Sequence, residues 1–399
     1  MTGQVHGDIE RGSTVPAGPG PGYIFDLVRR GRARTRGEIL EATGLARMTV
    51  SQRVDALLAA NLLREGGTDQ SARGRRPRRL EFNVQHSVVA AAAVDTTHTR
   101  TALTALDGTI LADVDVDVDV TDGPESVLPV VTSAIQGLLE RTGTTLSQLS
   151  GIGICVPGPI EPLTSRPSQP PIMPGWDAYP IIEHVQGVLD VPVLVENDAN
   201  AMAIGEYSAG YEDSGSICVV KVSTGIGVGI VVDGRVYQGI DGGAGDIGHV
   251  RLPGHPDALC QCGARGCLAA VASGRAVATS LGAAGIEAHS GRDVGALLAR
   301  GDVETVNRTR DAGRVIGEVM ASMVCLLNPG VLLMGGALAS SPLISGVRET
   351  LYPNSPPRAT RSLDVGLASL GENAEIVGMT RTVVDHIFSP RAVDALLAE

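Results

Sequence analysis

The stretch from Gly242 to Cys267 constrains the fold more than any other part of this 399-residue sequence. It contains three of the six cysteines and two of the eight histidines. The spacing Cys-x-Cys-x4-Cys places Cys260, Cys262 and Cys267 on a short loop, and two intervening glycines let that loop fold back. Three thiolates and one histidine make up a structural zinc site. We therefore predict a zinc-binding loop here.

Two points about this loop stay open from the spacing alone. Either His249 or His255 can supply the fourth ligand. The alternative to a metal site, three free core cysteines, fits poorly with the polar, glycine-rich surroundings. Disulfides are disfavoured because the N-terminal sequence has no secretory signal.

Basic residues gather near the N-terminus. Residues 1–84 contain 14 arginines and nine acidic residues, whereas the remainder contains 18 basic and 35 acidic residues, with an overall net charge of −12. This asymmetry suggests a small module that faces nucleic acid, attached to an acidic body. The first 20 residues are polar and have no apolar signal core, so we expect a disordered tail and a cytoplasmic protein without a membrane segment.

Residues 21–83 carry the pattern of a winged helix-turn-helix. An amphipathic helix over 22–31 is followed over 35–63 by two helices that are separated by a turn at Gly44, and their apolar residues point to one small core. Asn61 tolerates the left-handed conformation that ends such a helix. Residues 62–83 then read as a two-stranded wing. Taken alone, the helix pair could be an ordinary helical hairpin and the arginines a solvated charge run. Because the helix pair and the arginines are adjacent in the chain, DNA binding is favoured.

The second of these helices is expected to enter the major groove with its N-terminus first. The residues that it would present are Arg47, Met48, Thr49, Ser51, Gln52 and Arg53. The wing tip would place Arg73, Arg75 and Arg76 against phosphates or in a narrow minor groove. Ala46 is a weak point of this interpretation, because a serine or threonine is expected at the helix N-cap.

From Val88 onward, strands and helices alternate, with glycine-rich loops at the strand ends. This order indicates an α/β protein that binds its ligand at those ends. Three consecutive strands are expected over 88–120. The alternating acids from Asp113 to Val120 fit an exposed strand face better than a calcium site. The segment 167–180, with the only tryptophan, Trp176, is expected to form a loop over the cleft.

The chain from residue 22 to about 385 resembles the ROK family of repressors, open reading frames and kinases. The sequence Val-Glu-Asn-Asp-Ala-Asn-Ala over 195–201 looks like the family's sugar-binding loop, and Gly-Asp-Ile-Gly-His over 245–249, followed by the cysteines, looks like its zinc signature. The resemblance implies an actin-like, two-lobed ATPase fold over 86–390. It also implies that His249, rather than His255, completes a structural zinc site on a loop over 249–267.

By the same resemblance, Asn197, Asp198, Asp246 and His249 would bind a sugar or related ligand between the lobes. Asp198 matches the family's catalytic base. The phosphate side departs from the kinase pattern Asp-x-Gly-Gly-Thr-Lys, since residues 95–100 read Asp-Thr-Thr-His-Thr-Arg. In Met334-Gly335-Gly336-Ala337, an alanine replaces the third glycine of the usual nucleotide-side triplet. The kinase-type glutamate two residues after the last cysteine of the loop is replaced by Ala269. We therefore expect no kinase activity and a vestigial base.

The sequence thus predicts a transcriptional regulator, expected to be a repressor of sugar-related genes. Its partners would be a double-stranded DNA operator and a sugar-like effector, and the family suggests a homodimer or homotetramer. The alternative function is an ATP-dependent kinase of a hexose or amino sugar. A regulator controlled by a protein partner instead of a sugar is a third possibility.

Overall fold

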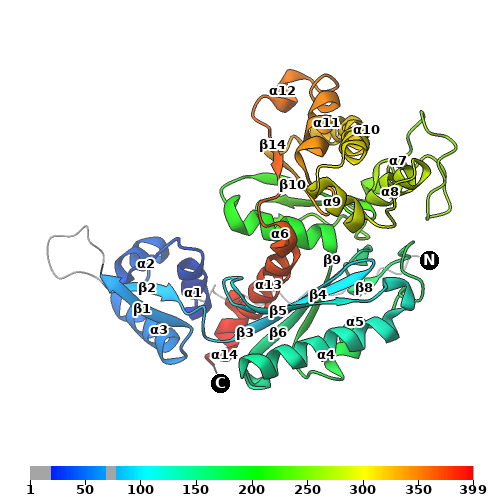
Figure 1. Ribbon diagram of the computed structural model, residues 1–399. Coiled ribbons are helices and arrows are strands. Elements are labelled where there is room, and N and C mark those ends of the chain that lie inside the picture. The colour runs from blue at the N-terminus through cyan, green and yellow to red at the C-terminus, as the bar shows by residue number, and fades with distance from the viewer. Residues whose placement is uncertain (1–18, 69–77, 399) are drawn as a thin grey trace, which may run out of the picture. The chain divides into compact units, whose positions relative to one another are not determined.

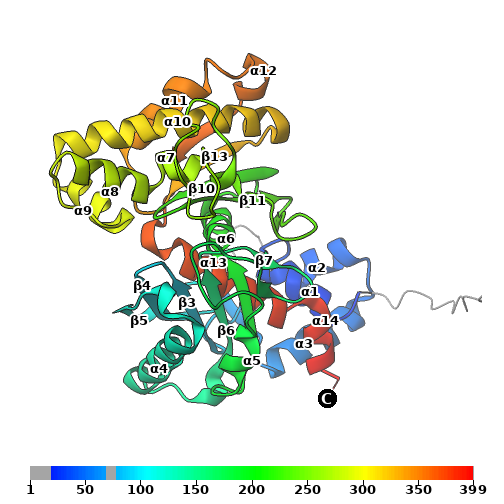
Figure 2. The ribbon, with the colours of Figure 1, turned by 90° about the vertical axis from the view of Figure 1, so that its right-hand side faces the viewer.

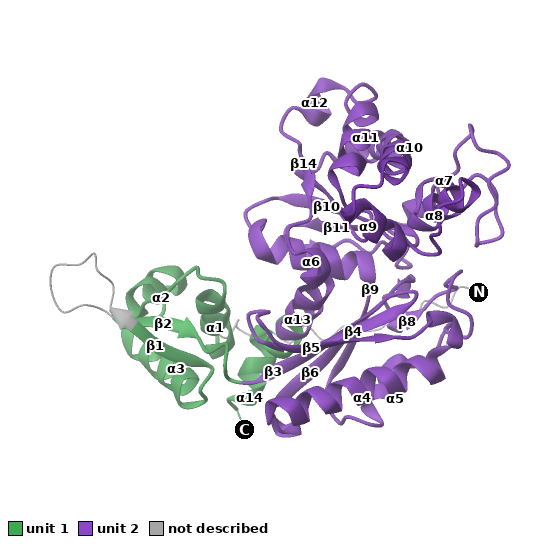
Figure 3. Cartoon of the chain, viewed as in Figure 1, with its two compact units in different colours: residues 1–86, 385–399 green, residues 87–384 purple. Residues whose placement is uncertain are grey.

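The structure, a computed structural model, describes residues 19–68 and 78–398 (Figure 1). Most of the expected tail and the wing-tip residues Arg73, Arg75 and Arg76 lie outside the described residues. The chain forms two compact units, one of residues 1–86 and 385–399 and one of residues 87–384 (Figure 3). The expected boundary at residue 390 therefore differs from the structure, because the C-terminal segment joins the first unit.

The first unit has the element order of a winged helix-turn-helix. Its helices are α1 (Pro21–Arg29), α2 (Arg36–Thr43), α3 (Arg47–Ala59) and α14 (Pro390–Leu396), and its strands are β1 (Leu63–Thr68) and β2 (Arg78–Phe82). The Thr35 side chain caps α2 by accepting from the Glu38 amide at 3.2 Å. Gly44, at φ 65°, ends α2 in the left-handed conformation expected of this turn. The left-handed conformation of Asn61, at φ 58°, is confirmed.

All three phenylalanines of the chain meet in the core of this unit. Phe25 of α1 and Phe82 of β2 have ring centroids 5.4 Å apart, and Phe388 lies 6.0 and 6.1 Å from them. The Gly22 amide donates to Asp394 of α14 at 2.7 Å. A Cβ at Gly22 would collide with the Pro390 carbonyl oxygen, so the close approach of α1 to α14 requires glycine. The C-terminal helix is therefore an integral part of the unit.

The second unit contains two five-stranded sheets with the same strand pattern. The first has the order β5-β4-β3-β6-β9 and the second the order β12-β11-β10-β13-β14. In each sheet, the first two pairings are antiparallel and the last two are parallel. The strands are β3 (Val88–Val94), β4 (His98–Ala105), β5 (Ile110–Asp117), β6 (Leu149–Val156), β9 (Val193–Asn197), β10 (Ser216–Val222), β11 (Ile226–Val232), β12 (Arg235–Val236), β13 (Val331–Gly335) and β14 (Asp364–Leu367). A two-stranded ribbon, β7 (Ile160–Glu161) and β8 (Arg166–Pro167), follows β6.

Helices cover both sheets (Figure 2). They are α4 (Pro124–Thr142), α5 (Ile181–Gln186), α6 (Asp198–Gly210), α7 (Leu268–Ala272), α8 (Gly274–Ala283), α9 (Gly291–Ala299), α10 (Val303–Leu327), α11 (Ser341–Leu351), α12 (Pro357–Thr360) and α13 (Ala374–Ile387). Residues of α4 and α5 pack on the first sheet, and residues of α7, α8, α10 and α11 pack on the second. On the other faces, α6 and the N-terminal part of α13 contact both sheets. The unit is thus two similar α/β layers that share central helices.

One local expectation is corrected in part. Segment 167–180 does line a cavity, through Ser168, Gln169, Pro171 and Ile172. Trp176 itself is fully buried in the core between α4 and the first sheet, and its indole nitrogen donates to the Val120 carbonyl at 2.9 Å. The stretch 195–201, which resembles the sugar-binding loop, is not a loop, because β9 ends at Asn197 and α6 begins directly at Asp198 with Asn197 as its cap. The three strands expected over 88–120 are confirmed as β3, β4 and β5. Across residues 19–68 and 78–398, no helix is both long enough and apolar enough to span a membrane.

Candidate functional site

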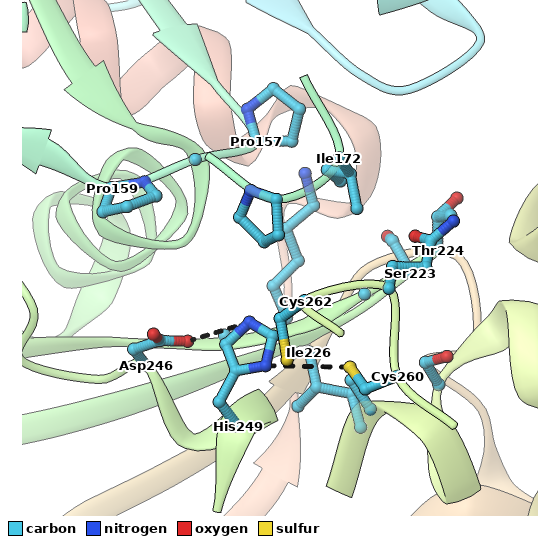
Figure 4. A pocket seen from close by; sticks show the side chains of 18 of the residues that line it. Pro157, Pro159, Ile172, Ser223, Thr224, Ile226, Asp246, His249, Cys260 and Cys262 are labelled. Atoms are coloured by element: carbon cyan, nitrogen blue, oxygen red, sulfur yellow. Dashed lines mark hydrogen bonds and ion pairs between the residues drawn. The ribbon is translucent and has the colours of Figure 1, made fainter. Parts of the chain in front are cut away.

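A cavity of about 980 Å³ opens in the second unit (Figure 4). Its wall includes residues that follow β3, β6 and β9 of the first sheet and β10 of the second, together with the cysteine loop. Ligands of open α/β sheets bind outside the carboxyl ends of such strands, where backbone and polar side chains converge. The four expected ligand-binding residues, Asn197, Asp198, Asp246 and His249, all line this cavity.

The junction of β9 and α6 orients Asn197 and Asp198. Oδ1 of Asn197 caps the helix by accepting from the amides of Ala199 and Asn200 at 2.9 and 3.2 Å, and its amide nitrogen donates to Gly158 at 3.0 Å. Asp198 accepts from the Ala199 amide at 2.8 Å and from the Lys221 ammonium at 2.7 Å. Both side chains are therefore fixed before a ligand arrives.

A buried polar network supports this junction from behind. Glu196 accepts from the Asn197 amide at 2.8 Å, from Asn200 Nδ2 at 3.0 Å and from Gln238 Nε2 at 2.8 Å. Burial raises the pKa of Glu196, although these hydrogen bonds act in the opposite direction. Asn200 is 4% exposed and lines the cavity, and its Oδ1 has no hydrogen-bond partner among the described residues. A buried acceptor of this kind is ready to receive a hydroxyl or amide donor.

The opposite wall is built by the short 3-10 turn Ile247–His249 and the cysteine loop. His249 Nδ1 lies 3.8 Å from Cys260 Sγ, while its Nε2 faces Asp246 Oδ1, also at 3.8 Å (Figure 4). One ring nitrogen thus points to the thiols and the other to a carboxylate at the cavity. In metal sites, a carboxylate beside the free ring nitrogen of a histidine ligand orients the ring, and Asp246 lies on the side where it could do so.

The cysteine loop brings four possible ligand atoms together. Those of His249, Cys260, Cys262 and Cys267 all lie within 4.8 Å of one another, and Cys262 Sγ is 3.8 Å from Cys267 Sγ. Sulfurs about 2.3 Å from a tetrahedral metal ion are separated by about 3.8 Å, so the donor set fits such an ion. Gly263 and Gly266, at φ 82° and 78°, make the turns that return the chain. His255 is not in the cluster.

The loops that follow β3 and β10 meet on another side of the cavity. Thr96 Oγ1 and Thr224 Oγ1 are 2.9 Å apart. The Ala337 amide donates to Ser223 Oγ at 3.1 Å, so the loop after β13 is tied to the loop after β10. Side-chain hydrogen bonds thus connect the loops that follow β3, β10 and β13 at this side of the cavity.

In the first unit, α3 presents a largely exposed N-terminal half. Arg47 and Gln52 are exposed, Met48 is 70% exposed, and Thr49 and Ser51 are half-buried. Arg53 is half-buried and its guanidinium donates to the Pro19 carbonyl. This donor group is therefore engaged within the unit. No side chain caps the helix at Ala46, so its first amides are free to meet an anion.

The ROK family model matches residues 91–385. The chain belongs to the ROK family. A xylose repressor of Bacillus spizizenii is 31% identical to it, over 88% of this chain and 91% of that protein. Among solved structures, a ROK family transcriptional regulator described as a homolog of the E. coli MLC protein superposes with a TM-score of 0.78 at 24% identity, covering 95% of this chain and 98% of that one. A ROK family glucokinase from Streptomyces griseus, solved with glucose and AMPPNP, gives a TM-score of 0.65 at 25% identity over 74% of this chain and 99% of its own.

These findings confirm the expected family and the two-lobed ROK fold. The sequence interpretation missed Asn200 and Gln238, which bind Glu196 behind the Asn197–Asp198 junction, and the ion pair of Lys221 with Glu375. Asn200 carried a signal, because its spacing of three residues from Asn197 places both on one helical turn. Lys221 also carried a signal, as the only lysine in a chain rich in arginine.

Proposed function

We propose that this protein is a DNA-binding transcriptional repressor of sugar-related genes whose ROK cleft binds a sugar-like effector. The observation that carries the proposal is the combination in one chain of a basic winged helix-turn-helix with a cavity that retains a pre-oriented Asn197–Asp198 pair. The xylose repressors similar to it over most of their length support the same function. Such a protein would meet its operator in the cytoplasm, as a homodimer or homotetramer.

For the DNA interface we propose α3 as the reading element. Arg47, Met48 and Gln52 are exposed in its N-terminal half and would reach base edges, with Thr49 and Ser51 beside them. The wing arginines Arg73, Arg75 and Arg76 would neutralise phosphates. Arg53 was expected among the DNA contacts, but its bond to the Pro19 carbonyl favours a role in holding the helix in place.

For the effector we propose a ligand that carries several hydroxyl groups. The Asp198 carboxylate would accept a hydrogen bond from one ligand hydroxyl, and the Asn197 side-chain amide would donate one to a neighbouring hydroxyl. Asp246 and His249 would contact ligand hydroxyls from the opposite wall. The unpartnered oxygen of Asn200 adds a further acceptor. Paired donors and acceptors at fixed positions suit a sugar, since each hydroxyl both donates and accepts.

We further propose that the four-residue cluster holds zinc in a structural role. Three cysteines and one histidine are a preferred zinc donor set, and four protein ligands leave no open position for a water molecule. The ion would brace the loop that carries His249 and Asp246. It would act on effector binding only by holding these two residues in place.

The alternative function, a sugar kinase, has the position of Asp198 and the glucokinase relatives in its favour. The residues Thr97 and His98, which stand where the kinase pattern has two glycines, argue against it, as does the hydrogen bond between Thr96 and Thr224 across the two loops. A coupled assay for ADP release with glucose, xylose and N-acetylglucosamine decides this point. Turnover that disappears in Asp198→Asn would establish the kinase.

The repressor proposal is tested by a mobility-shift assay on the DNA upstream of the protein's own gene, with and without D-xylose and D-glucose. We expect a shifted complex at moderate salt that is lost when the right sugar is added. Gln52→Ala should relax sequence preference, whereas Arg75→Ala should weaken binding to all sequences and reduce its salt dependence. Absence of a complex in every condition contradicts the proposal.

A further inference from the structure

The only lysine of the chain lies at the centre of the ROK cleft. Lys221, on β10, is 6% exposed, and its ammonium faces three carboxylates from three elements. Nζ lies 2.7 Å from Asp198 at the start of α6, 2.5 Å from Glu375 at the start of α13 and 3.5 Å from Asp95 at the end of β3. The residue therefore connects the second sheet to the first sheet and to both central helices.

The charges of this cluster depend on one another. Burial lowers the pKa of Lys221, but the attraction of Asp198, Glu375 and Asp95 outweighs it and holds that pKa well above its ordinary value, so the amine stays an ammonium. Burial raises the pKa of Glu375, and the Lys221 charge acts against that rise. A buried charge without a partner is strongly unfavourable, so removing the lysine or one of the carboxylates would destabilise the charges that remain.

A lysine suits this place better than any of the arginines used elsewhere in the chain. Its ammonium is a compact point charge with three donors in a tetrahedral array, and it can face three acids that converge from different directions. A guanidinium is planar and larger, and it pairs best with one carboxylate in a fork. The arrangement around Lys221 is one that a small divalent cation would otherwise satisfy, because such cations prefer carboxylate oxygens.

We propose that Lys221 is a specificity-determining residue that serves as the cleft's built-in cation. Its ammonium takes the place of a divalent metal ion among Asp95, Asp198 and Glu375, and holds Asp198 as an oriented acceptor for a ligand hydroxyl. The cleft then binds an uncharged polyol and needs neither a metal ion among these three carboxylates nor a nucleotide. This inference rests on the proposed effector binding for its ligand, but its claim about cations is independent of the ligand.

The closed loops beside the cluster support this assignment. Thr96 follows Asp95 directly, and its contact with Thr224 joins the same two strand ends that the Lys221–Asp95 ion pair joins. An internal cation and a hydroxyl pair thus hold these ends together. Beyond them the cavity wall carries the acids Asp241 and Asp246 and one arginine, Arg275. Close to the two acids, an anionic ligand such as a sugar phosphate is disfavoured.

The single lysine permits a direct test on the full-length, zinc-loaded protein. Growth with [ε-13C]lysine gives one side-chain resonance, that of Lys221. We expect 1 mM Mg²⁺ not to shift this resonance and 1 mM Mn²⁺ not to broaden it. A resonance that Mn²⁺ broadens at this concentration overturns the proposal, because the metal then shares the site with the lysine.

Substitution provides the second arm. Lys221→Ala should gain a Mn²⁺ site at least tenfold tighter than any in the wild type, measured by titration calorimetry, and the double variant with Glu375→Gln should lose that gain. Lys221→Arg, which keeps the charge, is the matched control and should gain nothing. A folded Lys221→Ala protein that binds Mn²⁺ no better than wild type also overturns the proposal; if this variant does not fold, the wild-type resonance alone decides.

Addition of D-xylose, D-glucose or glucose 6-phosphate separates the ligand question from the cation question. We expect a neutral sugar, but not the phosphate, to shift the Lys221 resonance through Asp198. A shift produced by glucose 6-phosphate alone overturns the assignment of an uncharged ligand. Failure of every sugar tested, with the Mn²⁺ results as expected, counts against the proposed effector function and leaves the cation role supported.

Discussion

At the scale of single residues, Asp198 combines a structural and a ligand-binding position. It starts α6, pairs with Lys221 and lines the ROK cleft. Asp198→Asn keeps the shape but removes the charge, and Lys221 retains Asp95 and Glu375 as partners. Because a hydrogen bond to a charged group contributes about 1.5–3 kcal/mol, we expect effector affinity to fall about 10- to 100-fold, as measured by calorimetry.

The control for this prediction is Asp190→Asn, which changes an exposed acid of the same unit. It should leave effector affinity unchanged. If Asp198→Asn binds the effector as tightly as the wild type does, Asp198 makes no contact with the ligand and the assigned cleft is wrong.

Glu196 gives a prediction about pH. Burial raises its folded-state pKa above the ordinary 4.5, so the folded protein holds this proton more tightly than the unfolded chain does. The stability that Glu196 contributes is therefore fully present below pH 4.5 and is lost as pH rises through the raised folded pKa. Each unit of such a shift corresponds to about 1.4 kcal/mol.

Glu196→Gln cannot ionise, so its unfolding free energy should decline less than that of the wild type as pH rises from 4.5 to 8. Urea unfolding at a series of pH values measures the difference. Glu140→Gln, at an exposed position on α4, is the matched control and should follow the wild-type profile. Parallel profiles for wild type and Glu196→Gln would show that the buried carboxyl is not protonated in this range.

The sequence indicates which residues lie at the cavity where a local motif contains them. It does not indicate those that only the fold brings together. Asn197, Asp198, Asp246 and His249 line one cavity as expected, because two family signatures contain them. Glu375 lies far along the chain, and nothing local marks it as a partner of Lys221. Trp176 was misplaced because a proline-rich segment has no periodicity that distinguishes a buried side chain from an exposed one.

At the scale of elements, the cysteine loop should behave as a metal-dependent element. We expect one zinc ion per chain, and its removal by a chelator should lower the unfolding free energy by about 4 kcal/mol when free zinc is about a thousandfold above its dissociation constant. Cys262→Ser should reproduce the loss without chelator, as measured by metal analysis and thermal unfolding. Cys325→Ser, at an exposed cysteine outside the cluster, should match the wild type.

The C-terminal segment is an element that the sequence did not assign to the first unit, because the expected ROK domain extended to residue 390 and nothing was assigned beyond it. Phe388 is 4% exposed and packs against Phe25 and Phe82, so truncating it leaves a cavity in the first unit. Phe388→Ala should destabilise this unit by about 3–5 kcal/mol and abolish operator binding in a mobility-shift assay, whereas sugar-induced thermal stabilisation of the ROK domain should remain. Phe388→Leu should lose much less in both assays.

The missed assignment has a physical reason. Sequence patterns report on neighbours along the chain, and they located α1, α2, α3 and the strand pair because each has local caps, turns or alternation. A segment that returns from the far end carries only a short amphipathic pattern, which fits any apolar surface. The available clue was that the chain has only three phenylalanines, two of them in the winged helix-turn-helix at 25 and 82 and the third near the C-terminus at 388. If Phe388→Ala leaves operator binding intact, the segment is an accessory and not part of the folded unit.

At the scale of the whole molecule, the repeated strand order of the two sheets explains how the ROK fold can serve both kinases and regulators. Each sheet delivers loops to the cleft from its strand ends, and the central helices α6 and α13 contact both sheets. A ligand that binds at the start of α6 therefore touches elements shared by both halves. In this chain, the Lys221–Asp95 ion pair and the Thr96–Thr224 hydrogen bond join the same two halves.

If the protein is a repressor, effector and operator binding are linked through the chain. Thermodynamic linkage requires that the factor by which the sugar weakens operator affinity equals the factor by which the operator weakens sugar affinity, and such factors are commonly about 5- to 150-fold. We expect equal factors from two titrations, one of operator by sugar-saturated protein and one of sugar by operator-saturated protein. Asp198→Asn should still bind the operator, but sugar added at a concentration that just saturates the wild type should change its operator affinity less than it changes that of the wild type. An operator affinity that sugar changes in this variant as strongly as in the wild type would place the effector outside the cleft, because only a ligand with different affinities for the two states can shift them.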